Sequence, residues 1–407
     1  MNKKKYKISI ITVLAIILFS FCRTVYAADE LSINAKSALI VETNTGKIIY
    51  EKDINEPNYP ASTTKILTAI LTIEKCNLEE TATVSQNAIS NIPTAYVVAP
   101  LYVGEEMKIK DLLYALMLKS SNDAAYVLAE HVGGSVEGFA EMMNNKAKEI
   151  GCKNTHFVNP NGIDNKNHYT TAYDMYLIAN YAMKNETFAK IVSTYQYTLP
   201  GTNKHPASDR IMKNTNNFVN PGSTFYNKIV KGVKTGTTDL AGNCLITDSA
   251  NNNLEFITVV LGAETSNSKF TETQKMIDYA YKNYTLSDLH KKDDVIKNIE
   301  VKNATKETKN LNVIISDDIT VINNVKTKVS DIEPEIVLND NIVAPISKGQ
   351  ELGTIKYNVD GTEYTAKLVA QNDVVVKTYY VEIAIGVGSF IVILLILGTV
   401  GKKVRKR

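Results

Sequence analysis

The sequence predicts a mixed α/β (α+β) fold, in which helices pack on a sheet, followed by a small all-β region. Strand-like segments at 37–50 and 228–261 enclose a series of helical patterns. This order indicates one sheet with a helical insertion between its early and late strands. After about residue 286 the chain has only short strand-like runs separated by Asn and Asp turns. Both ends carry apolar segments beside basic residues.

Residues 1–27 are typical of a secretory signal peptide. Basic residues come first, an apolar run follows from Ile8 to Phe21, and Val25 and Ala27 stand where a cleavage site needs small residues. We therefore expect export, with cleavage after Ala27. An uncleaved N-terminal anchor is the alternative interpretation.

Residues 28–285 are expected to form the first extracytoplasmic domain. Two strands joined by a turn at Gly46 open it, and after Pro60 comes a helical run, Ser62–Lys75, that is apolar on most faces and so predicted to be buried. The remaining segments are predicted from periodicity. Helices are expected at 109–118, 123–131, 136–150, 172–184 and 271–284, and strands at 228–234, 243–248 and 256–261.

Residues 286–378 are predicted to form a second, β-rich domain. Its clearest signal is a hairpin in which two strand-like runs flank Asp360-Gly361. Shorter strands are expected at 311–316, 319–322 and 335–338. Because the region contains none of the chemical motifs described below, we expect it to act as a spacer or docking module.

The C-terminal end predicts a single membrane span. Residues 379–401 are apolar apart from Glu382, with tyrosines at the start, and residues 402–407 form a basic tail. As a helix, 381–401 would be about 31 Å long, which matches a hydrocarbon core. The basic tail is expected on the cytoplasmic side. The protein is thus predicted to be a single-pass membrane protein that is tethered by its C-terminal end and works outside the cytoplasm.

Charge and composition exclude several classes of function. With the basic residues of both ends and Glu382 set aside, 35 basic and 42 acidic residues remain, a net charge of −7. An acidic ectodomain disfavours nucleic acid as a partner. The five histidines lack the spacing of a zinc hydrolase. Cys76, Cys152 and Cys244 lack metal-like spacing and are expected to be small buried residues.

Ser62-Thr-Thr-Lys65 is the first of three ordered motifs that carry chemistry. At helical spacing, residues three apart share a face, so Lys65 is expected beside Ser62. A serine hydroxyl needs a base, and a lysine amine is a base only when burial or a second cation lowers its pKa. A helix cap with a solvated lysine is the alternative for this motif alone.

The other two motifs are Ser120-Ser-Asn122 and Lys234-Thr-Gly236. Ser120 and Asn122 lie in a break between two predicted helices, where they cap a helix or act as a proton relay and an amide ligand. Lys234 and Thr235 end a predicted strand and are suited to binding a carboxylate. Gly236 would let an extended peptide approach the strand edge, and the Thr237 N–H would join that of Ser62 in an oxyanion hole.

The specificity of the signal lies in the combination. Ser-x-x-Lys recurs at Ser266–Lys269, and Ser-x-Asn recurs at three other places. Lys-Thr-Gly occurs once, and it follows the other two motifs in a fixed order and in fitting local settings. This order favours an acyl-serine enzyme.

The chain resembles the serine D-alanyl-D-alanine carboxypeptidases, the low-molecular-mass penicillin-binding proteins. The resemblance rests on the three motifs and on their surroundings, and it covers roughly residues 35–375. The matching segments beyond the motifs include Ser37-Ala-Leu-Ile-Val-Glu-Thr-Asn-Thr-Gly, Asn159-Pro-Asn-Gly, His168-Tyr-Thr-Thr-Ala, Ser347-Lys-Gly-Gln and Val359-Asp-Gly. It implies a penicillin-binding/β-lactamase-like transpeptidase fold with an antiparallel sheet.

The resemblance also implies roles for individual residues. Ser62 would be the acylated nucleophile, Lys65 its general base and Ser120 the proton relay. Substrate-binding residues would be Asn122, Lys234, Thr235, Gly236 and Thr237. The implied reaction removes the terminal D-alanine from peptidoglycan stem pentapeptides through an acyl-enzyme, with β-lactams as covalent inhibitors and with no metal or organic cofactor.

Three alternatives to this function and one departure from the family pattern accompany the resemblance. A D,D-endopeptidase or transpeptidase acting on crosslinked strands would use the same residues, and a catalytically inactive cell-wall binder is a further possibility. A β-lactamase is disfavoured because no Glu-x-x-Leu-Asn lies between Asn122 and Lys234. Relatives often place an arginine after the strand that follows Lys-Thr-Gly, and here the nearest candidate is Lys269, which lacks the bidentate fork of arginine.

Overall fold

The structure is a computed structural model that describes residues 31–377, 387 and 389–393. The predicted signal peptide, 1–27, lies outside the described residues. The elements below belong to the compact unit that begins at Ala35.

A five-stranded antiparallel sheet forms the centre of the first half, in the order β2-β1-β9-β8-β7. Its first two strands, β1 (Ser37–Glu42) and β2 (Ile48–Lys52), form a hairpin. The late strands follow one another as β7 (Val230–Thr238), β8 (Gly242–Asn251) and β9 (Leu254–Ala263). Because β1 pairs with β9, early and late chain meet in one sheet and the helical segment between them is an insertion, as predicted.

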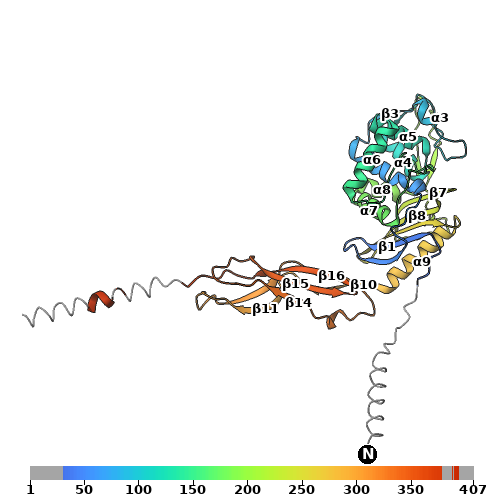
Figure 1. Cartoon of the computed structure of the whole chain (residues 1–407). Coiled ribbons are helices and arrows are strands. Elements are labelled where there is room, and N and C mark those ends of the chain that lie inside the picture. The colour runs from blue at the N-terminus through green and yellow to red at the C-terminus, as the bar shows by residue number, and fades with distance from the viewer. Residues whose placement is uncertain (1–30, 378–386, 388, 394–407) are drawn as a thin grey trace, which may run out of the picture. The chain divides into compact units, whose positions relative to one another are not determined.

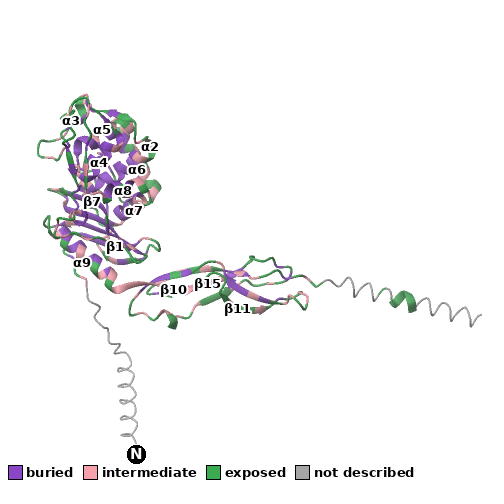
Figure 2. Ribbon diagram, turned by 180° about the vertical axis from the view of Figure 1, so that it is seen from behind, coloured by how far each residue is buried: buried purple, intermediate pink, exposed green. Residues whose placement is uncertain are grey.

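Helices cover both faces of this sheet (Figure 1). On one face, α7 packs on β1 and β9 and α8 packs on β7, while α9 packs on β8 and β9 from the other face. All six residues of β1 are consequently buried, as Figure 2 shows for the sheet in general. The helices are η1 (Ala61–Thr64), α2 (Lys65–Lys75), α3 (Gln86–Ser90), α4 (Ile109–Leu118), α5 (Asn122–Gly133), α6 (Val136–Ile150), α7 (Ala172–Met183), α8 (Glu186–Ser193), η2 (Asn217–Val219) and α9 (Ser268–Asn283).

The prediction that a helix begins at Ser62 is wrong in one respect. Residues Ala61–Thr64 form a 3-10 turn, and the α-helix starts at Lys65. The tighter turn arises because both the N–H and the hydroxyl of Thr63 donate to the Pro60 carbonyl, at 3.2 and 2.6 Å. Ala61 has a left-handed backbone, with φ of 48°, which sets the direction of this turn.

A second correction concerns Lys234-Thr-Gly236, which was expected to end a strand. The strand β7 continues to Thr238, so these residues lie in its middle and pair with Cys244–Ile246 of β8. The helix α8 was not predicted. Two small hairpins complete this part: β3 (Thr81–Thr83) with β4 (Glu106–Lys108), and β5 (Gln196–Thr198) with β6 (Ile211–Lys213).

Within residues 284–377 the chain forms strands, as predicted, with one short 3-10 helix, η3 (Val329–Asp331). Five strands form a sheet in the order β11-β12-β16-β15-β14, and β10 pairs with β13. A separate core of buried residues, which includes Leu311, Ile355 and Leu368, holds these strands together. The strands are β10 (Tyr284–His290), β11 (Val295–Glu300), β12 (Asn310–Ile315), β13 (Ile319–Asn324), β14 (Glu335–Leu338), β15 (Glu351–Val359) and β16 (Thr362–Ala370).

The membrane span predicted at 379–401 falls mostly outside the described residues. Within the described part of the chain, we find no helix with the length and apolar character needed to cross a bilayer.

Candidate active site

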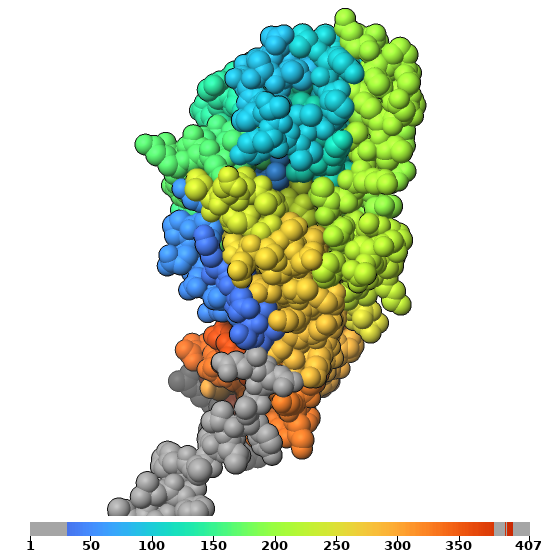
Figure 3. Space-filling view, turned by 90° about the vertical axis from the view of Figure 1, so that its right-hand side faces the viewer, coloured from blue at the N-terminus to red at the C-terminus, as the bar shows by residue number. Residues whose placement is uncertain are grey.

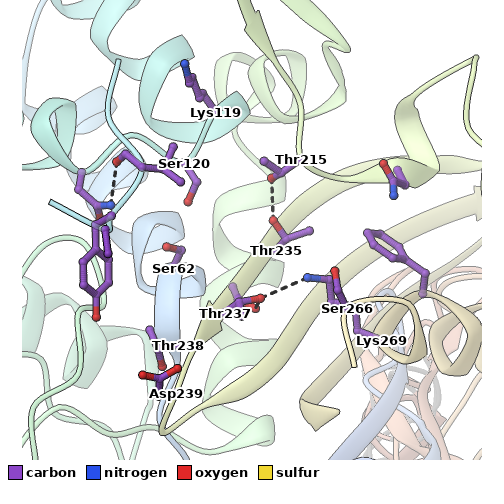
Figure 4. Close-up of a pocket in the computed structure, with 17 residues that line it drawn as sticks. Ser62, Lys119, Ser120, Thr215, Thr235, Thr237, Thr238, Asp239, Ser266 and Lys269 are labelled. Atoms are coloured by element: carbon purple, nitrogen blue, oxygen red, sulfur yellow. Dashed lines mark hydrogen bonds between the residues drawn. The ribbon is translucent and has the colours of Figure 1, made fainter. Parts of the chain in front are cut away.

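The three sequence motifs meet at one pocket. Figure 3 shows a hollow between the cyan part of the chain, around residue 100, and the yellow-green part, around residue 235. The pocket lining includes Ser62 from η1, Ser120 and Asn122 from the α4–α5 junction, and the β7 residues Thr235–Thr238. In the close-up, Ser62, Ser120 and Thr237 face the same space (Figure 4). The two predicted lysines, Lys65 and Lys234, are buried at 0% and 1% exposure.

The Lys65 amine is held by three oxygen atoms. Its Nζ lies 2.9 Å from Ser62 Oγ, 3.0 Å from Asn122 Oδ1 and 2.8 Å from the backbone oxygen of Asn161. As an ammonium ion it donates to all three. The neutral amine keeps two N–H groups. These donate to the Asn161 carbonyl oxygen and to Asn122 Oδ1, which can only accept hydrogen bonds. The lone pair then faces the one remaining partner, the Ser62 hydroxyl, which does carry a proton.

Electrostatics favour the neutral form of this amine. Complete burial lowers the pKa of Lys65 well below its ordinary value, and the positive charge of Lys234 lowers it further. The carboxylate of Asp123 opposes the shift. However, Asp123 accepts hydrogen bonds from the backbone N–H groups of Ala99 and Leu101, at 2.9 and 3.2 Å, and these donors partly compensate its negative charge. The arrangement therefore pairs a serine hydroxyl with a base that is poised to accept its proton.

Ser120 takes part in this geometry without contacting Lys65 directly. It lines the pocket and has a left-handed backbone, with φ of 65°, which is uncommon for a residue other than glycine. The conformation ends α4 and allows α5 to begin two residues later, so that Asn122 enters the first turn of α5 with its side chain on Lys65. Asn122 also donates to the Val97 carbonyl through Nδ2, at 2.9 Å, which fixes its amide orientation.

The middle of β7 places a second positive charge below the pocket surface. Burial, with a smaller contribution from the charge of Lys269, lowers the pKa of Lys234 to about 7. Its Nζ donates to the Thr235 carbonyl at 3.0 Å. The Thr235 hydroxyl lies in the pocket and is 2.6 Å from that of Thr215, a residue not predicted from the sequence (Figure 4).

Gly236 also makes a close backbone approach that the sequence did not predict. A Cβ at this position would lie 3.0 Å from both Ala61 Cβ and the Ser62 nitrogen, and 3.1 Å from the Pro60 oxygen. These distances are shorter than ordinary van der Waals contacts. The glycine therefore lets β7 approach the turn that carries Ser62. This close approach brings the Ser62 N–H next to the β7 backbone at Gly236.

Lys269, the candidate in place of the family arginine, does reach the pocket. It lies in the first turn of α9, lines the pocket, and its Nζ is 3.4 Å from Thr237 Oγ1 (Figure 4). Burial lowers its pKa. One end of the pocket is thus lined by hydroxyls, from Thr215, Thr235 and Thr237, in a field set by Lys234 and Lys269. This is suited to a carboxylate.

Two segments that the sequence singled out without a role support the base. The Asn159–Gly162 loop supplies the Asn161 carbonyl to Lys65, and the Thr68 hydroxyl of α2 donates to the Pro160 oxygen at 2.6 Å. Gly162 has φ of 82°, and a Cβ there would lie 1.7 Å from the Ala61 oxygen, so only glycine fits.

His168, in the second of these segments, is a buried and neutral residue. Its Nδ1 accepts from the Val158 N–H at 3.1 Å, so Nε2 carries the hydrogen that faces Thr64 Oγ1, 2.9 Å away. Burial, with smaller contributions from His156 and Lys65, lowers its pKa to about 3. His168 therefore ties the loop to the turn that carries Ser62 without adding a charge.

Sequence comparisons match this chain to two families. Residues 24–265 match the family described as D-alanyl-D-alanine carboxypeptidase, and residues 284–376 match the C-terminal domain of penicillin-binding protein 5. The chain is 35% identical over 380 residues to the D-alanyl-D-alanine carboxypeptidase DacF of Bacillus subtilis, covering 90% of this chain and 94% of the relative. It is 29% identical to DacC of Escherichia coli, covering 84% and 86%.

Solved structures agree with this match. Penicillin-binding protein 5 from Haemophilus influenzae superimposes with a TM-score of 0.70 at 27% identity, covering 86% of this chain and 99% of that one. PBP3 from Streptococcus pneumoniae gives 0.67 at 26% identity, covering 84% and 100%. The Streptomyces K15 DD-transpeptidase gives 0.59 at 31% identity, covering 62% of this chain and 99% of that one.

Proposed function

Because the chain belongs to the D-alanyl-D-alanine carboxypeptidase family, we propose that it removes the terminal D-alanine from peptidoglycan stem pentapeptides by acyl-serine chemistry. The observation that carries this proposal is the buried Lys65 amine, which lies 2.9 Å from Ser62 Oγ and is held by two further acceptors. A neutral amine in this position can act as the general base that takes the proton of Ser62.

In the acylation step, the Ser62 oxygen attacks the carbonyl carbon of the penultimate D-alanine while its proton passes to Lys65. The N–H groups of Ser62 and Thr237 stabilise the negative charge that develops on the substrate oxygen. Lys65 then returns this proton, through the Ser120 hydroxyl, to the leaving amine, which departs as free D-alanine. Lys65 is neutral again and accepts a proton from the water that attacks the ester, and this proton returns to the Ser62 oxygen as the acyl group leaves.

Substrate recognition depends on the side of the pocket that is formed by β7. Since β7 is an edge strand of the sheet, an extended peptide can align with it in the manner of an added strand. The terminal carboxylate is then bound by the hydroxyls of Thr235 and Thr237 in the field of Lys234 and Lys269, and Asn122 binds a backbone amide. β-Lactams acylate Ser62 because they present a reactive carbonyl and a carboxylate in the same relation. No step in this scheme calls for a metal or an organic cofactor.

A transpeptidase or endopeptidase activity is the second candidate, and one observation favours it. The Streptomyces K15 protein, a DD-transpeptidase, shares the fold of the first part of this chain. The same acyl-enzyme would then be resolved by an amine instead of water, or formed from a crosslinked peptide.

We further propose that the protein works outside the cytoplasm of a bacterial cell, tethered to the membrane by residues 379–401. The support is the sequence itself, with its signal-like residues 1–27, its apolar C-terminal segment and its basic end at 402–407. In this arrangement, residues 28–285 form the catalytic domain and residues 286–378 a β-rich spacer. Protease accessibility of the β region in intact spheroplasts tests the topology.

Release of free D-alanine from a stem pentapeptide, measured beside cleavage of crosslinked dimers and transfer to an added amine, tests the activity. We expect D-alanine release to predominate and to be lost in Ser62→Ala, together with labelling by a fluorescent penicillin. Labelling of the Ala variant at the wild-type level would rule out Ser62 as the nucleophile. Dominant dimer cleavage or transfer would replace the carboxypeptidase assignment by the second candidate.

A further inference from the structure

Three side chains with the chemistry of metal ligands meet at the end of α2 that is remote from Ser62. Cys76 caps the C-terminus of α2, Glu80 precedes β3, and His131 lies in the last turn of α5. The thiol sulfur, a carboxylate oxygen and an imidazole nitrogen all lie within 4.8 Å of one another. His131 Nε2 is 3.3 Å from Glu80 Oε1.

The fold holds these residues in place through their backbones. The Cys76 N–H donates to the Thr72 carbonyl at 3.0 Å, and the Glu80 carbonyl accepts from the Ile109 N–H at 3.0 Å. Helix α5 packs against both α2 and β3, and Figure 1 labels α5 and β3 side by side. The convergence of the three side chains is therefore a consequence of tertiary packing.

Their spacing is close to what a tetrahedral ion requires. Zn–S and Zn–N bonds of about 2.3 and 2.0 Å would separate neighbouring tetrahedral ligands by about 3.3 to 3.5 Å. The 3.3 Å between His131 and Glu80 already has this value, and small rotations of Cys76 would bring its sulfur into the same range. A thiolate, an imidazole and a carboxylate form a donor set that Zn²⁺ accepts.

We propose that Cys76, Glu80 and His131 bind one Zn²⁺ ion, with water in the fourth position. Water has access because the side chains of Glu80 and His131 are 41% and 30% exposed. On binding, the bond from Cys76 sulfur to hydrogen is replaced by one to zinc, and the proton passes to solvent. The affinity therefore increases with pH.

The effect of this ion would be structural. Helix α2 begins with Lys65 and α5 begins with Asn122, so both helices carry an active-site residue at one end and a metal ligand at the other. Eleven helical residues span about 16 Å, which keeps the ion away from the reacting atoms. Zinc would crosslink α2 and α5 and stabilise their packing without changing the chemistry at Ser62.

Co²⁺ titration of the tag-free protein tests the proposal, because thiolate ligation to Co²⁺ gives an intense near-ultraviolet charge-transfer band. We expect a band that saturates at one ion per chain and is displaced by Zn²⁺, and a melting temperature that rises with Zn²⁺. Cys76→Ser abolishes the band, and His131→Gln weakens cobalt binding by at least tenfold. Penicillin acylation in each variant stays within twofold of wild type, which verifies folding independently of the metal.

Cys152→Ser is the matched control, because Cys152 is also a half-buried free thiol but belongs to no such ligand cluster among the described residues. This variant keeps the band. Absence of a band in the wild type, a band that survives in Cys76→Ser, or one that disappears in Cys152→Ser would overturn the inference. Each of these results leaves the assignment of Ser62 unaffected.

Discussion

Asn122→Asp tests whether Lys65 acts as the base, because it changes one atom type and adds one charge. The new carboxylate oxygen would stand 3.0 Å from Lys65 Nζ. With an effective dielectric constant of about 20, the attraction between the two charges is about 5 kcal/mol in favour of the ammonium form. Even if burial of the carboxylate cancels half of this energy, the fraction of free amine near neutral pH falls about 100-fold.

The assay is the second-order rate constant for acylation by penicillin, measured from mildly acidic to strongly alkaline pH. In the wild type we expect the rate to rise with pH as Lys65 loses its proton. In Asn122→Asp the same rise occurs at clearly higher pH. Asn122→Ala is the control, since it removes the acceptor without adding charge. Its rate is lower at every pH, but the rise stays where the wild type has it. If the Asp variant also rises at the wild-type pH, Lys65 is not the base.

Three further perturbations follow from other contacts. Gly236→Ala forces β7 and the Ser62 turn apart by a few tenths of an ångström and is expected to slow acylation about tenfold or more. The control is Gly222→Ala, whose Cβ meets one side-chain atom at 3.5 Å and which is expected to leave the acylation rate unchanged. Equal acylation rates in the two variants would contradict the packing argument. Asp248 is 1% exposed, and burial together with Glu255 raises its pKa above the ordinary range. The folded state therefore holds a proton that the unfolded chain loses above about pH 4, so the free energy of unfolding falls as pH rises. Urea unfolding at several pH values should show this slope disappear in Asp248→Asn, and an unchanged slope would assign it elsewhere. Glu105 is fully buried and forms an ion pair with Arg210, so Glu105→Gln should leave a buried charge unpaired and lower the free energy of unfolding by about 3 to 5 kcal/mol. The control is Glu79→Gln, which removes an exposed ion pair with Lys108 and should leave the urea midpoint unchanged.

Much of the scaffold could be predicted because its signals are local. The helices α4 and α6 have the bounds that periodicity predicted, since each has a continuous apolar stripe facing the core. The α4–α5 break at Ser120 was predicted from the same helical periodicity. By contrast, the 3-10 turn at Ala61–Thr64 depends on close approaches of Gly162 and Gly236 from distant parts of the chain.

The contacts that complete the site leave less trace in the sequence. The third acceptor of Lys65 is a backbone carbonyl, 96 residues away, and a carbonyl belongs to every residue type. His168 acts through a neutral tautomer that only its buried surroundings define. Cys76 and His131 show no metal-like spacing, because they belong to different helices that tertiary packing brings together.

The three lysines around the pocket have a consequence for the free enzyme. Lys269 acts on Lys234, and Lys234 acts on Lys65, each disfavouring the charge of the next. The amines of these lysines therefore repel one another in their charged forms. A terminal carboxylate bound beside Thr235 would offset this repulsion and raise their pKa values, so a ligand that carries one should bind with proton uptake. A ligand without a carboxylate would fit the same pocket but would not gain this electrostatic stabilisation.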